Sequence, residues 1–333
     1  MINKDPYHQL TESMGYMNSR VVPEILKKQV DLKEVELLLA AAPPATVVEL
    51  ADKTGIPTNE VEKMIEPLFI KGMIFKSKKE GVIRYYRARH VIQFHDANLL
   101  TPGLSGEVLD LWREYDQQEW PGDQDIITQF MPNAAVRILP VNVSVPIETQ
   151  ILAFDDVTCM VEKAIALAVV NCTCRMLHGD CGKPVEVCIQ TDKAADYTLE
   201  RGTGREITKD EAIEILRLCE QENLVHTVSN SRSGGNIICN CCDDCCVNWP
   251  GAIKYDTKFA APSRFTASID IDECTGCEAC LDRCYFDAIR MDSEKETAVI
   301  VEENCMGCGL CLVACDFDAL SLKETRAHDF VPD

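Results

Sequence analysis

The chain has 333 residues, a formal net charge of −21 and nineteen cysteines. This length allows two or three domains that each bury a core, and an apolar fraction of 46% excludes a disordered chain. The acidic balance disfavours non-specific binding to nucleic acid, because the chain and the phosphates repel each other.

The start of the chain bears on its redox setting. Residues 1–20 show no apolar segment behind a basic start, so we expect no secretory signal peptide. No run approaches the roughly 18 apolar residues of a membrane-spanning helix, and the best candidate is only residues 164–170. We therefore expect a reduced, cytoplasmic setting, where dense cysteines serve as metal ligands more often than as disulfides.

Charge and cysteines are distributed unevenly along the chain. Residues 1–95 carry 14 Lys and Arg against 12 Asp and Glu, whereas residues 96–333 carry 19 against 42. No cysteine precedes Cys159. We expect two regions with different functions, of which the acidic, cysteine-rich one suits docking against basic patches on protein partners.

Residues 31–90 predict a regular order of elements. We expect helices over residues 32–41, 46–54 and 58–71, the third opened by a threonine cap. Two strands should follow within residues 73–90, around a turn at Lys79, Glu80 and Gly81. This order resembles a winged-helix domain, and we assign it to residues 1–95.

The winged-helix resemblance implies either DNA binding or protein docking. The third helix, which would enter the major groove, exposes Glu60, Glu62 and Glu66. Pro67 should also disturb its middle. We favour a protein-interaction module, because these carboxylates would lie beside phosphates. The wing is nevertheless basic, with Lys76, Lys78, Lys79, Arg84, Arg87 and Arg89.

Residues 96–140 show a less regular pattern. They contain two tryptophans, Trp112 and Trp120, and two prolines, Pro121 and Pro132. We interpret the segment as a linker with one helix, or as an arm that packs on a partner.

We assign residues 141–262 to an α/β, cysteine-rich iron–sulfur domain. Apolar residues at helical spacing predict a helix over residues 155–170. A second helix over residues 209–222 begins with a capping box formed by Thr208 and Glu211. Cys159 and Cys219 lie on these helices, apart from any cysteine group, and we interpret them as small core residues.

Nine further cysteines form two groups in the sequence. Neither group has the spacing of a zinc finger, ribbon or knuckle. Adjacent cysteines also rarely bind one tetrahedral zinc together, whereas a cluster offers several metal corners. Two additional iron–sulfur clusters would use eight of the nine and leave one free. The first group is Cys172, Cys174, Cys181 and Cys188, and the second is Cys239, Cys241, Cys242, Cys245 and Cys246.

Two partitions of these nine cysteines are open. In the local partition, the first group binds a third cluster, and four cysteines of the second group bind a fourth cluster. In the shared partition, cysteines of both groups contribute to the same sites. Arg175 either donates hydrogen bonds to cluster sulfurs or is an ordinary surface residue, and we interpret His178 as a loop residue. The region resembles cysteine-rich segments of uncharacterised iron–sulfur proteins of anaerobes, a resemblance that names no reaction.

The C-terminal region, residues 263–333, contains a repeat at an offset of 31 residues. Each copy has the spacing C-x2-C-x2-C-x3-C, and the residues that follow also match. The pattern resembles the bacterial two-cluster ferredoxins, which implies a (βαβ)2 domain with two 4Fe-4S clusters. Zinc sites built from C-x2-C units do not explain this spacing twice over. The copies are Cys274, Cys277, Cys280 and Cys284, then Cys305, Cys308, Cys311 and Cys315.

The ferredoxin resemblance implies crossed ligand sets, in which each cluster takes its fourth cysteine from the other motif. The family's proline after the fourth cysteine is replaced by Tyr285 and Asp316, which affects the exit of each loop. Glycines suit loops that wrap a cluster closely; they are Gly276, Gly307 and Gly309. The implied sets are Cys274, Cys277, Cys280 and Cys315 for cluster 1, and Cys305, Cys308, Cys311 and Cys284 for cluster 2.

The sequence shows no motif for a reaction of its own. It has no phosphate-binding loop, no complete dinucleotide fingerprint and no Ser/His/Asp spacing, so we assign no catalytic residue. We expect an α+β multidomain electron-transfer subunit with about four 4Fe-4S clusters and about sixteen irons. Its partners would be a soluble donor such as a ferredoxin and an oxidoreductase with a flavin, molybdenum or tungsten centre. A redox-sensing winged-helix regulator and a reductase with an open cluster iron are the alternatives.

Overall fold

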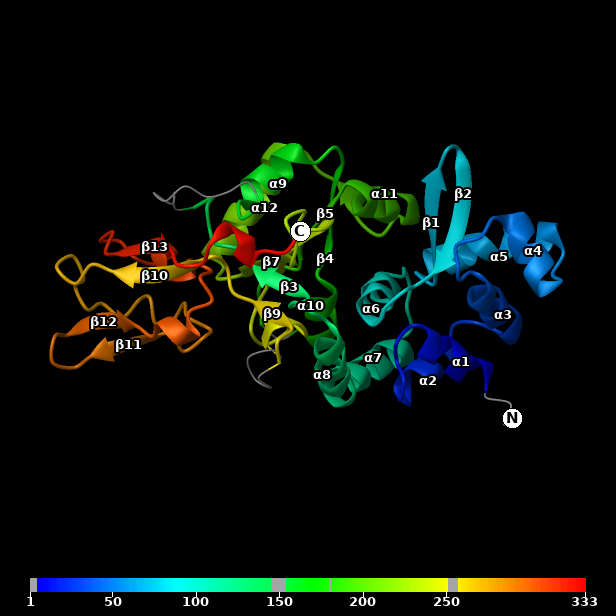
Figure 1. The fold of residues 1–333 in the computed structure, drawn as a ribbon, viewed down its shortest axis with the longest axis horizontal. Coiled ribbons are helices and arrows are strands. Elements are labelled where there is room, and N and C mark those ends of the chain that lie inside the picture. Colours follow the sequence, from blue (N-terminus) through cyan, green and yellow to red (C-terminus); the bar gives the residue numbers. More distant parts are fainter. Residues whose placement is uncertain (1–4, 145–153, 180, 251–256) are drawn as a thin grey trace. The chain divides into compact units, whose positions relative to one another are not determined.

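The computed structural model describes residues 5–144, 154–179, 181–250 and 257–333. The chain divides into two compact units, Met1–Asp123 and Gln124–Asp333 (Figure 1). Both mix helices and strands, so the expected α+β multidomain class is confirmed at that level. The helices within these described ranges lack the length and apolar character that a bilayer crossing requires.

The first unit is mainly helical and contains one hairpin. The predicted order of three helices and two strands is found over residues 32–87. Its elements are α1 (Pro6–Ser13), α2 (Val21–Lys27), α3 (Leu32–Ala40), α4 (Val47–Thr54), α5 (Thr58–Ile70), β1 (Ile74–Lys79), β2 (Val82–Arg87), α6 (Val91–Leu99) and α7 (Gly106–Gln118), and α8 (Trp120–Phe130) crosses into the second unit.

The start of α5 differs from the prediction. Pro57 is its N-cap and makes no side-chain cap, whereas α4 begins with a reciprocal capping box between Thr46 and Glu49. Thr58 is therefore the first helical residue and not a cap. Pro67 does not break the helix, because it lies in the last turn, where little of the helix remains after it.

The β1–β2 hairpin has the predicted turn. Glu80 and Gly81 have φ values of 52° and 81°, as a two-residue turn between antiparallel strands requires. Lys79 pairs with Val82 across this turn.

The segment expected as a linker or arm is instead largely helical. Trp112 of α7 is fully buried, and its indole N–H donates to Asn98 at 2.9 Å. Its ring contacts Phe94 and Tyr115 edge-on. These residues form a core of the first unit. Val108, Trp112 and Tyr115 have helical spacing, a signal that identifies α7 in the sequence.

The second unit is built on a seven-stranded sheet. Apart from the parallel pair β3–β9, all neighbouring strands are antiparallel. The expected mixture of helices and strands is therefore found, in a sheet that is mainly antiparallel. The strand order is β6 (Arg205–Glu206), β4 (Leu167–Asn171), β5 (Glu186–Thr191), β8 (Ile237–Cys241), β7 (Val225–Ser229), β3 (Val136–Ile138) and β9 (Ala260–Ala261).

The helix predicted over residues 155–170 is only partly correct. Helix α9 (Val157–Lys163) ends early, and β4 follows it. Residues 167–170 are all buried because α11 packs on β4 and because Leu167 and Val169 pack against residues of α9 and α12. A strand buried on both faces is apolar throughout, so its pattern does not alternate and can resemble that of a buried helix.

Three more helices belong to the sheet unit: α10 (Thr173–His178), α11 (Asp192–Arg201) and α12 (Lys209–Gln221). The Thr208 hydroxyl accepts a bond from the Glu211 N–H at 3.2 Å, as predicted for α12. The Glu211 carboxylate instead binds Arg205 at 2.5 Å. Cys219 of α12 is fully buried, but it packs in one cluster with Cys242 and Cys245, so it is not remote from the cysteine groups.

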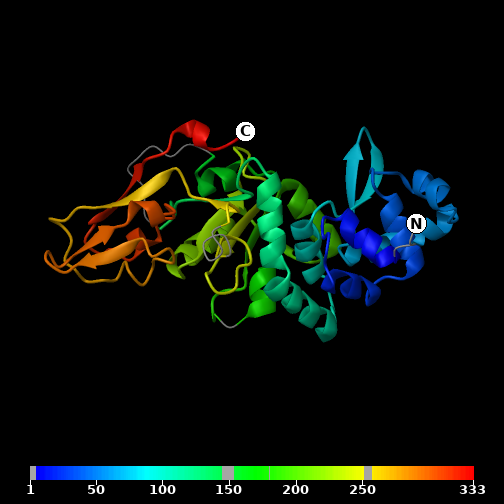
Figure 2. The ribbon, with the colours of Figure 1, turned by 60° about the horizontal axis from the view of Figure 1, so that its bottom comes forward.

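The C-terminal residues form two antiparallel strand pairs that lie side by side, as Figure 1 and Figure 2 show. β10 (Phe265–Ile269) pairs with β13 (Leu320–Glu324), and β11 (Ile289–Asp292) pairs with β12 (Thr297–Ile300). Helix α14 (Leu310–Val313) follows the second cysteine loop, whereas residues 279–283 of the first copy form turns. Short 3-10 helices occur at η1 (Glu302–Asn304) and η2 (His328–Phe330).

Two buried ionic networks hold the second unit together. In the first, Asp155 accepts bonds from Arg137 at 2.7 Å and from Arg264 at 2.6 Å, and all three side chains are fully buried. Arg264 also contacts Glu324 on β13 at 2.8 Å. This network therefore joins the large sheet to the β10–β13 strand pair.

The second network surrounds the buried carboxylate of Glu220 at the end of α12. Backbone N–H groups of Asn142 and Val143 donate to it at 2.9 and 3.0 Å, and His226 lies 3.4 Å away. Burial raises the pKa of Glu220, but the His226 hydrogen bond and charge outweigh burial and lower the pKa to about 2.

We expect Glu220 to make the second unit sensitive to acid. Its folded pKa of about 2 lies below the ordinary 4.5, so its contribution is complete above pH 4.5 and is lost as the pH falls toward 2. The shift corresponds to on the order of 3 kcal/mol at neutral pH. Far-UV circular dichroism should show that Glu220→Gln flattens the pH dependence of unfolding in this window. An unchanged slope would contradict this role. Any acid-labile clusters are lost from the wild type and the variant alike. The difference between their pH dependences of unfolding therefore reports the Glu220 carboxylate.

Candidate iron–sulfur sites

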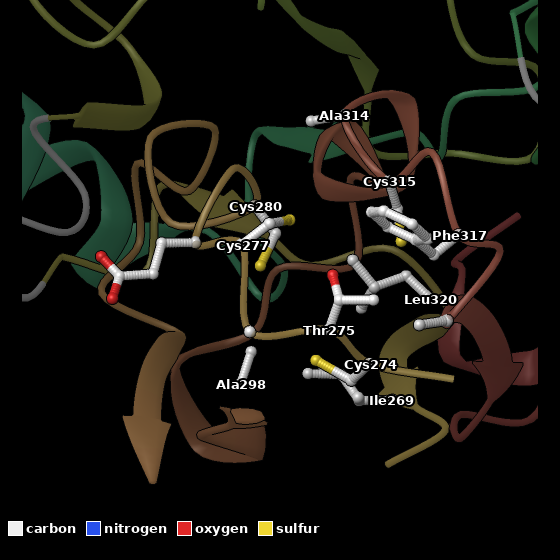
Figure 3. A pocket seen from close by; sticks show the side chains of 13 residues that line it. Ile269, Cys274, Thr275, Cys277, Cys280, Ala298, Ala314, Cys315, Phe317 and Leu320 are labelled. Atoms are coloured by element: carbon white, nitrogen blue, oxygen red, sulfur yellow. The ribbon is translucent and has the colours of Figure 1, made fainter. Parts of the chain in front are cut away.

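One pocket at the C-terminal strand pairs is lined by four thiols. They are the residues that the crossed arrangement assigns to cluster 1: Cys274, Cys277, Cys280 and Cys315. In Figure 3, the sulfur atoms of Cys277, Cys280 and Cys315 point toward a common space, and Cys274 lies across from them. Apart from Thr275 and Glu278, the remaining lining is small or apolar, including Ala298 and Ala319. Four soft sulfur donors around an apolar pocket fit a 4Fe-4S cube.

A second set of thiols lies beside the first. The pKa of Cys308 is raised to about 12, mainly by burial. The charges of Cys305 and Cys284 raise it in the same direction. Burial likewise raises the pKa of Cys311, and the charges of Cys308, Cys305, Cys284 and Cys280 add to it. Cys284 of the first motif thus lies with three thiols of the second motif, and Cys280 connects this set electrostatically to the first.

The two C-terminal sites differ in burial and in hydrogen bonding. Cys277 of the first site is exposed, whereas Cys305, Cys308 and Cys311 of the second are buried. The N–H of Ala267 lies 3.4 Å from the Cys305 sulfur. Burial and N–H···S bonds both tune the reduction potential of a cluster, so two clusters held here would differ in potential.

Gly307 illustrates why these loops require glycine. Its φ is +66°, and a Cβ there would overlap the carbonyl oxygen of Phe265 and the hydroxyl of Ser263. The side chain of any other residue would displace the loop that carries Cys305 and Cys308.

We expect Gly307→Ala to lower the iron content by about four atoms, because the second site cannot close around a cube. Iron and sulfide analysis of anaerobic protein would measure this loss. Gly103→Ala is the matched control, since Gly103 has a φ of +71° with no atom within 4 Å of an added Cβ. Equal iron content in both variants would show that the close backbone approach at Gly307 is not required for cluster binding.

Tyr285 takes the position where the ferredoxin pattern has proline. Its hydroxyl donates to the carbonyl of Asn223 at 2.6 Å, and its ring contacts Trp249. The adjacent Arg283 donates to the carbonyls of Glu220 and Gln221 at 2.7 and 3.0 Å. The loop exit therefore binds the C-terminal end of α12, a contact that proline could not make.

We expect Tyr285→Phe to lower the stability of the second unit by about 1 kcal/mol without loss of iron, because one buried hydrogen bond is removed. Thermal unfolding and iron analysis would measure both effects. Tyr7→Phe removes a similar hydroxyl–carbonyl bond, to Val30 at 3.0 Å, in the first unit. The prediction fails if Tyr285→Phe releases iron.

The nine middle cysteines do not separate as their sequence groups do. Six thiols lie near one another in a string, in which each thiol affects the pKa of its neighbours: Cys188 with Cys239, Cys239 with Cys241, Cys241 with Cys246, Cys246 with Cys174, and Cys174 with Cys172. The charges of Cys241 and Cys188 also act on Cys172. Hydrogen bonds from Cys239 and Cys246 hold the pKa of Cys241 well below its usual value.

The remaining three middle thiols form a separate group with a carboxylate. Cys181, Cys242, Cys245 and Asp244 have donor atoms that all lie within 4.8 Å of one another. Cys181 of the first sequence group thus lies with Cys242 and Cys245 of the second. The nineteen cysteines all lie within the described ranges, and none of them forms a disulfide there.

The structure also places the two other residues considered near these cysteines. Arg175 is 2% exposed, so it is not a surface residue. It donates to the Cys242 sulfur at 3.5 Å and to the Pro184 carbonyl at 2.6 Å. His178 is half-buried at the end of α10.

Residues 267–322 match the model of a 4Fe-4S dicluster domain. The match includes all eight cysteines of the C-terminal repeat. Together with the cysteine-rich middle region, it supports an iron–sulfur, ferredoxin-like domain and an electron-transfer role. No curated protein and no solved structure matches the chain.

Proposed function

We propose that the protein carries electrons through a row of iron–sulfur clusters, to or from a partner oxidoreductase. The observation that carries this proposal is a single buried core shared by both cysteine regions. It contains Cys241 and Cys246 of the middle region together with Cys280, Cys305, Cys308 and Cys311 of the dicluster domain. Clusters bound to these residues would be neighbours.

The row would begin at the dicluster site with the exposed thiol of Cys277. It would continue through the buried second site, whose ligands would be Cys284, Cys305, Cys308 and Cys311. Trp249 lies in the same core, next to Phe286 at a ring distance of 5.0 Å. Aromatic and sulfur-rich contacts therefore extend from the second site toward Cys246.

The six-thiol string would hold the third cluster of the row. A cube needs four thiolates, and the string offers Cys172, Cys174, Cys188, Cys239, Cys241 and Cys246. Three cubes contain about twelve irons, compared with the sixteen expected for four.

The first unit would serve as a docking module with winged-helix-like order. Two of its candidate recognition charges are engaged within the unit: Glu60 binds Lys33 at 2.5 Å, and Arg84 binds Glu49 at 2.6 Å. Arg89 stacks on Tyr86 at 4.3 Å. These contacts support protein docking over phosphate binding. The partner would hold a flavin, molybdenum or tungsten centre, and a soluble ferredoxin would be a second partner.

Anaerobic iron and acid-labile sulfide analysis, combined with electron paramagnetic resonance of the reduced protein, tests the carrier function. We expect about twelve irons and about twelve sulfides per chain, all in clusters that dithionite reduces. Iron without sulfide, or clusters that do not reduce, would contradict electron transfer. Specific, salt-sensitive retardation of a DNA fragment at nanomolar protein would contradict the docking role of the first unit.

A further inference from the structure

The four-donor group formed by Cys181, Cys242, Cys245 and Asp244 has the size of a single-ion site. The sulfurs of Cys242 and Cys181 are 3.9 Å apart, although 61 residues separate them in sequence. A tetrahedral zinc with Zn–S bonds of about 2.3 Å places its sulfurs about 3.8 Å apart. Thiolates of a cube bind different metal corners and are held apart by the whole cube, which the 4.8 Å limit of this group does not accommodate.

The other thiols lack this compactness. Within the described ranges, this is the one group of three or more metal-binding side chains whose donor atoms all lie within 4.8 Å of one another. Among the described residues, neither the eight cysteines of the dicluster domain nor the six-thiol string includes three thiols whose sulfurs all lie within that limit of one another.

The two adjacent cysteine pairs explain how both kinds of site arise from one segment. Neighbouring side chains on an extended backbone point in opposite directions. Cys241 ends β8 and joins the string, while Cys242 joins the compact group. In the second pair, Cys245 belongs to the compact group and Cys246 to the string. One cysteine of each adjacent pair thus belongs to the compact group, and the other belongs to the six-thiol string.

The charge and burial of the group also suit a metal ion. Cys242 and Cys245 are 1% and 3% exposed, so their thiolates would be costly without a cation. Arg175 donates to the Cys242 sulfur and is itself fixed by the carbonyls of Pro184 and Asn240, at 2.6 and 3.2 Å. Three thiolates and one carboxylate around a divalent ion leave two negative charges, and the guanidinium offsets one of them.

We propose that Cys181, Cys242, Cys245 and Asp244 bind one tetrahedral zinc ion, separate from the iron–sulfur clusters. A set of three thiolates and a carboxylate suits zinc, and four protein donors make a closed, structural site. The ion joins the loop before β5 to the turn after β8. It thereby holds Cys241 and Cys246 in place for the neighbouring cluster site.

The test is metal analysis of full-length protein purified anaerobically, with zinc K-edge X-ray absorption on the same sample. We expect one zinc per chain, with three sulfurs at about 2.3 Å and one oxygen at about 2.0 Å. Sixteen irons with no zinc would overturn the proposal in favour of a fourth cluster. Iron bound at this position without sulfide would overturn it as well.

Variants localise the ion. We expect Cys245→Ser to reduce zinc toward zero, and Asp244→Asn to weaken zinc retention against a chelator by at least about tenfold. Asp243→Asn is the matched control, because Asp243 is the adjacent exposed carboxylate outside the group. Equal zinc retention in Asp243→Asn and Asp244→Asn would overturn the role of Asp244. If Cys245→Ser does not fold, the zinc retention of Asp244→Asn still tests the site, because Asp244 is exposed.

The outcome is independent of the electron-carrier function. The paramagnetic resonance spectrum of the same samples reports the clusters, whereas zinc content reports this site. Loss of zinc from Asp244→Asn supports the zinc site, and an unchanged cluster spectrum in that sample would overturn only the role of the ion in holding Cys241 and Cys246 in place. Absent zinc in the wild-type protein with a normal spectrum overturns the zinc site and leaves the carrier function standing.

Discussion

Cys315→Ala is expected to abolish the cluster of the first C-terminal motif, although Cys315 belongs to the second. The structure places Cys315 in one pocket with Cys274, Cys277 and Cys280, so its loss leaves that cube with three protein ligands. Cys284→Ala should affect the other cluster in the same way, because Cys284 lies with Cys305 and Cys308. Each change should remove about four irons per chain.

Paired spectra can decide between crossed and uncrossed ligation. Electron paramagnetic resonance of reduced Cys315→Ala should lack the same signal as Cys277→Ala, and Cys284→Ala should lack the same signal as Cys308→Ala. Uncrossed sites would reverse these pairs. Cys159→Ala is the control, since Cys159 lies on α9 and binds Asp156, so both signals should remain.

Asp155→Asn is expected to destabilise the second unit by on the order of 3–5 kcal/mol, because it removes the charge that compensates two buried guanidinium groups. Arg137 and Arg264 are both fully buried and would be left without an anion between them. The apparent melting temperature should fall by about 10 °C. Calorimetry of anaerobic protein at one fixed scan rate would measure it.

Glu324→Gln provides the comparison for Asp155→Asn. Glu324 binds the same Arg264, but its side chain is 41% exposed, so water can replace it. We expect a loss of less than about 1 kcal/mol. Similar losses from both variants would show that burial does not set the strength of this network.

Local sequence signals predicted the elements whose pattern is periodic or whose turn has a chemical requirement. Helices α3, α4 and α12 and the hairpin turn at Glu80 and Gly81 follow the expected positions to within one or two residues. The prediction failed for β4, because a strand covered on both faces has no alternation to distinguish it from a helix. It also missed the buried aromatic core around Trp112.

The departure at Tyr285 shows a second limit. The sequence indicates that the ferredoxin proline is absent, but the reason lies 62 residues away, at the Asn223 carbonyl that the tyrosine hydroxyl binds. The role of Arg175 could not be predicted from the sequence for the same reason. The Cys242 sulfur, to which Arg175 donates at 3.5 Å, lies 67 residues away along the chain.

By itself, the sequence determined that the C-terminal region is a two-cluster iron–sulfur domain, because three ligands of each site lie within seven residues and their spacing encodes the loop. Only the tertiary structure decided how the middle cysteines associate. Cys181 meets Cys242 and Cys245, and Cys188 meets Cys239, through strands that pair over long sequence separations. Spacing along the chain carries no information about such contacts, because sheet pairing sets the distance between those thiols.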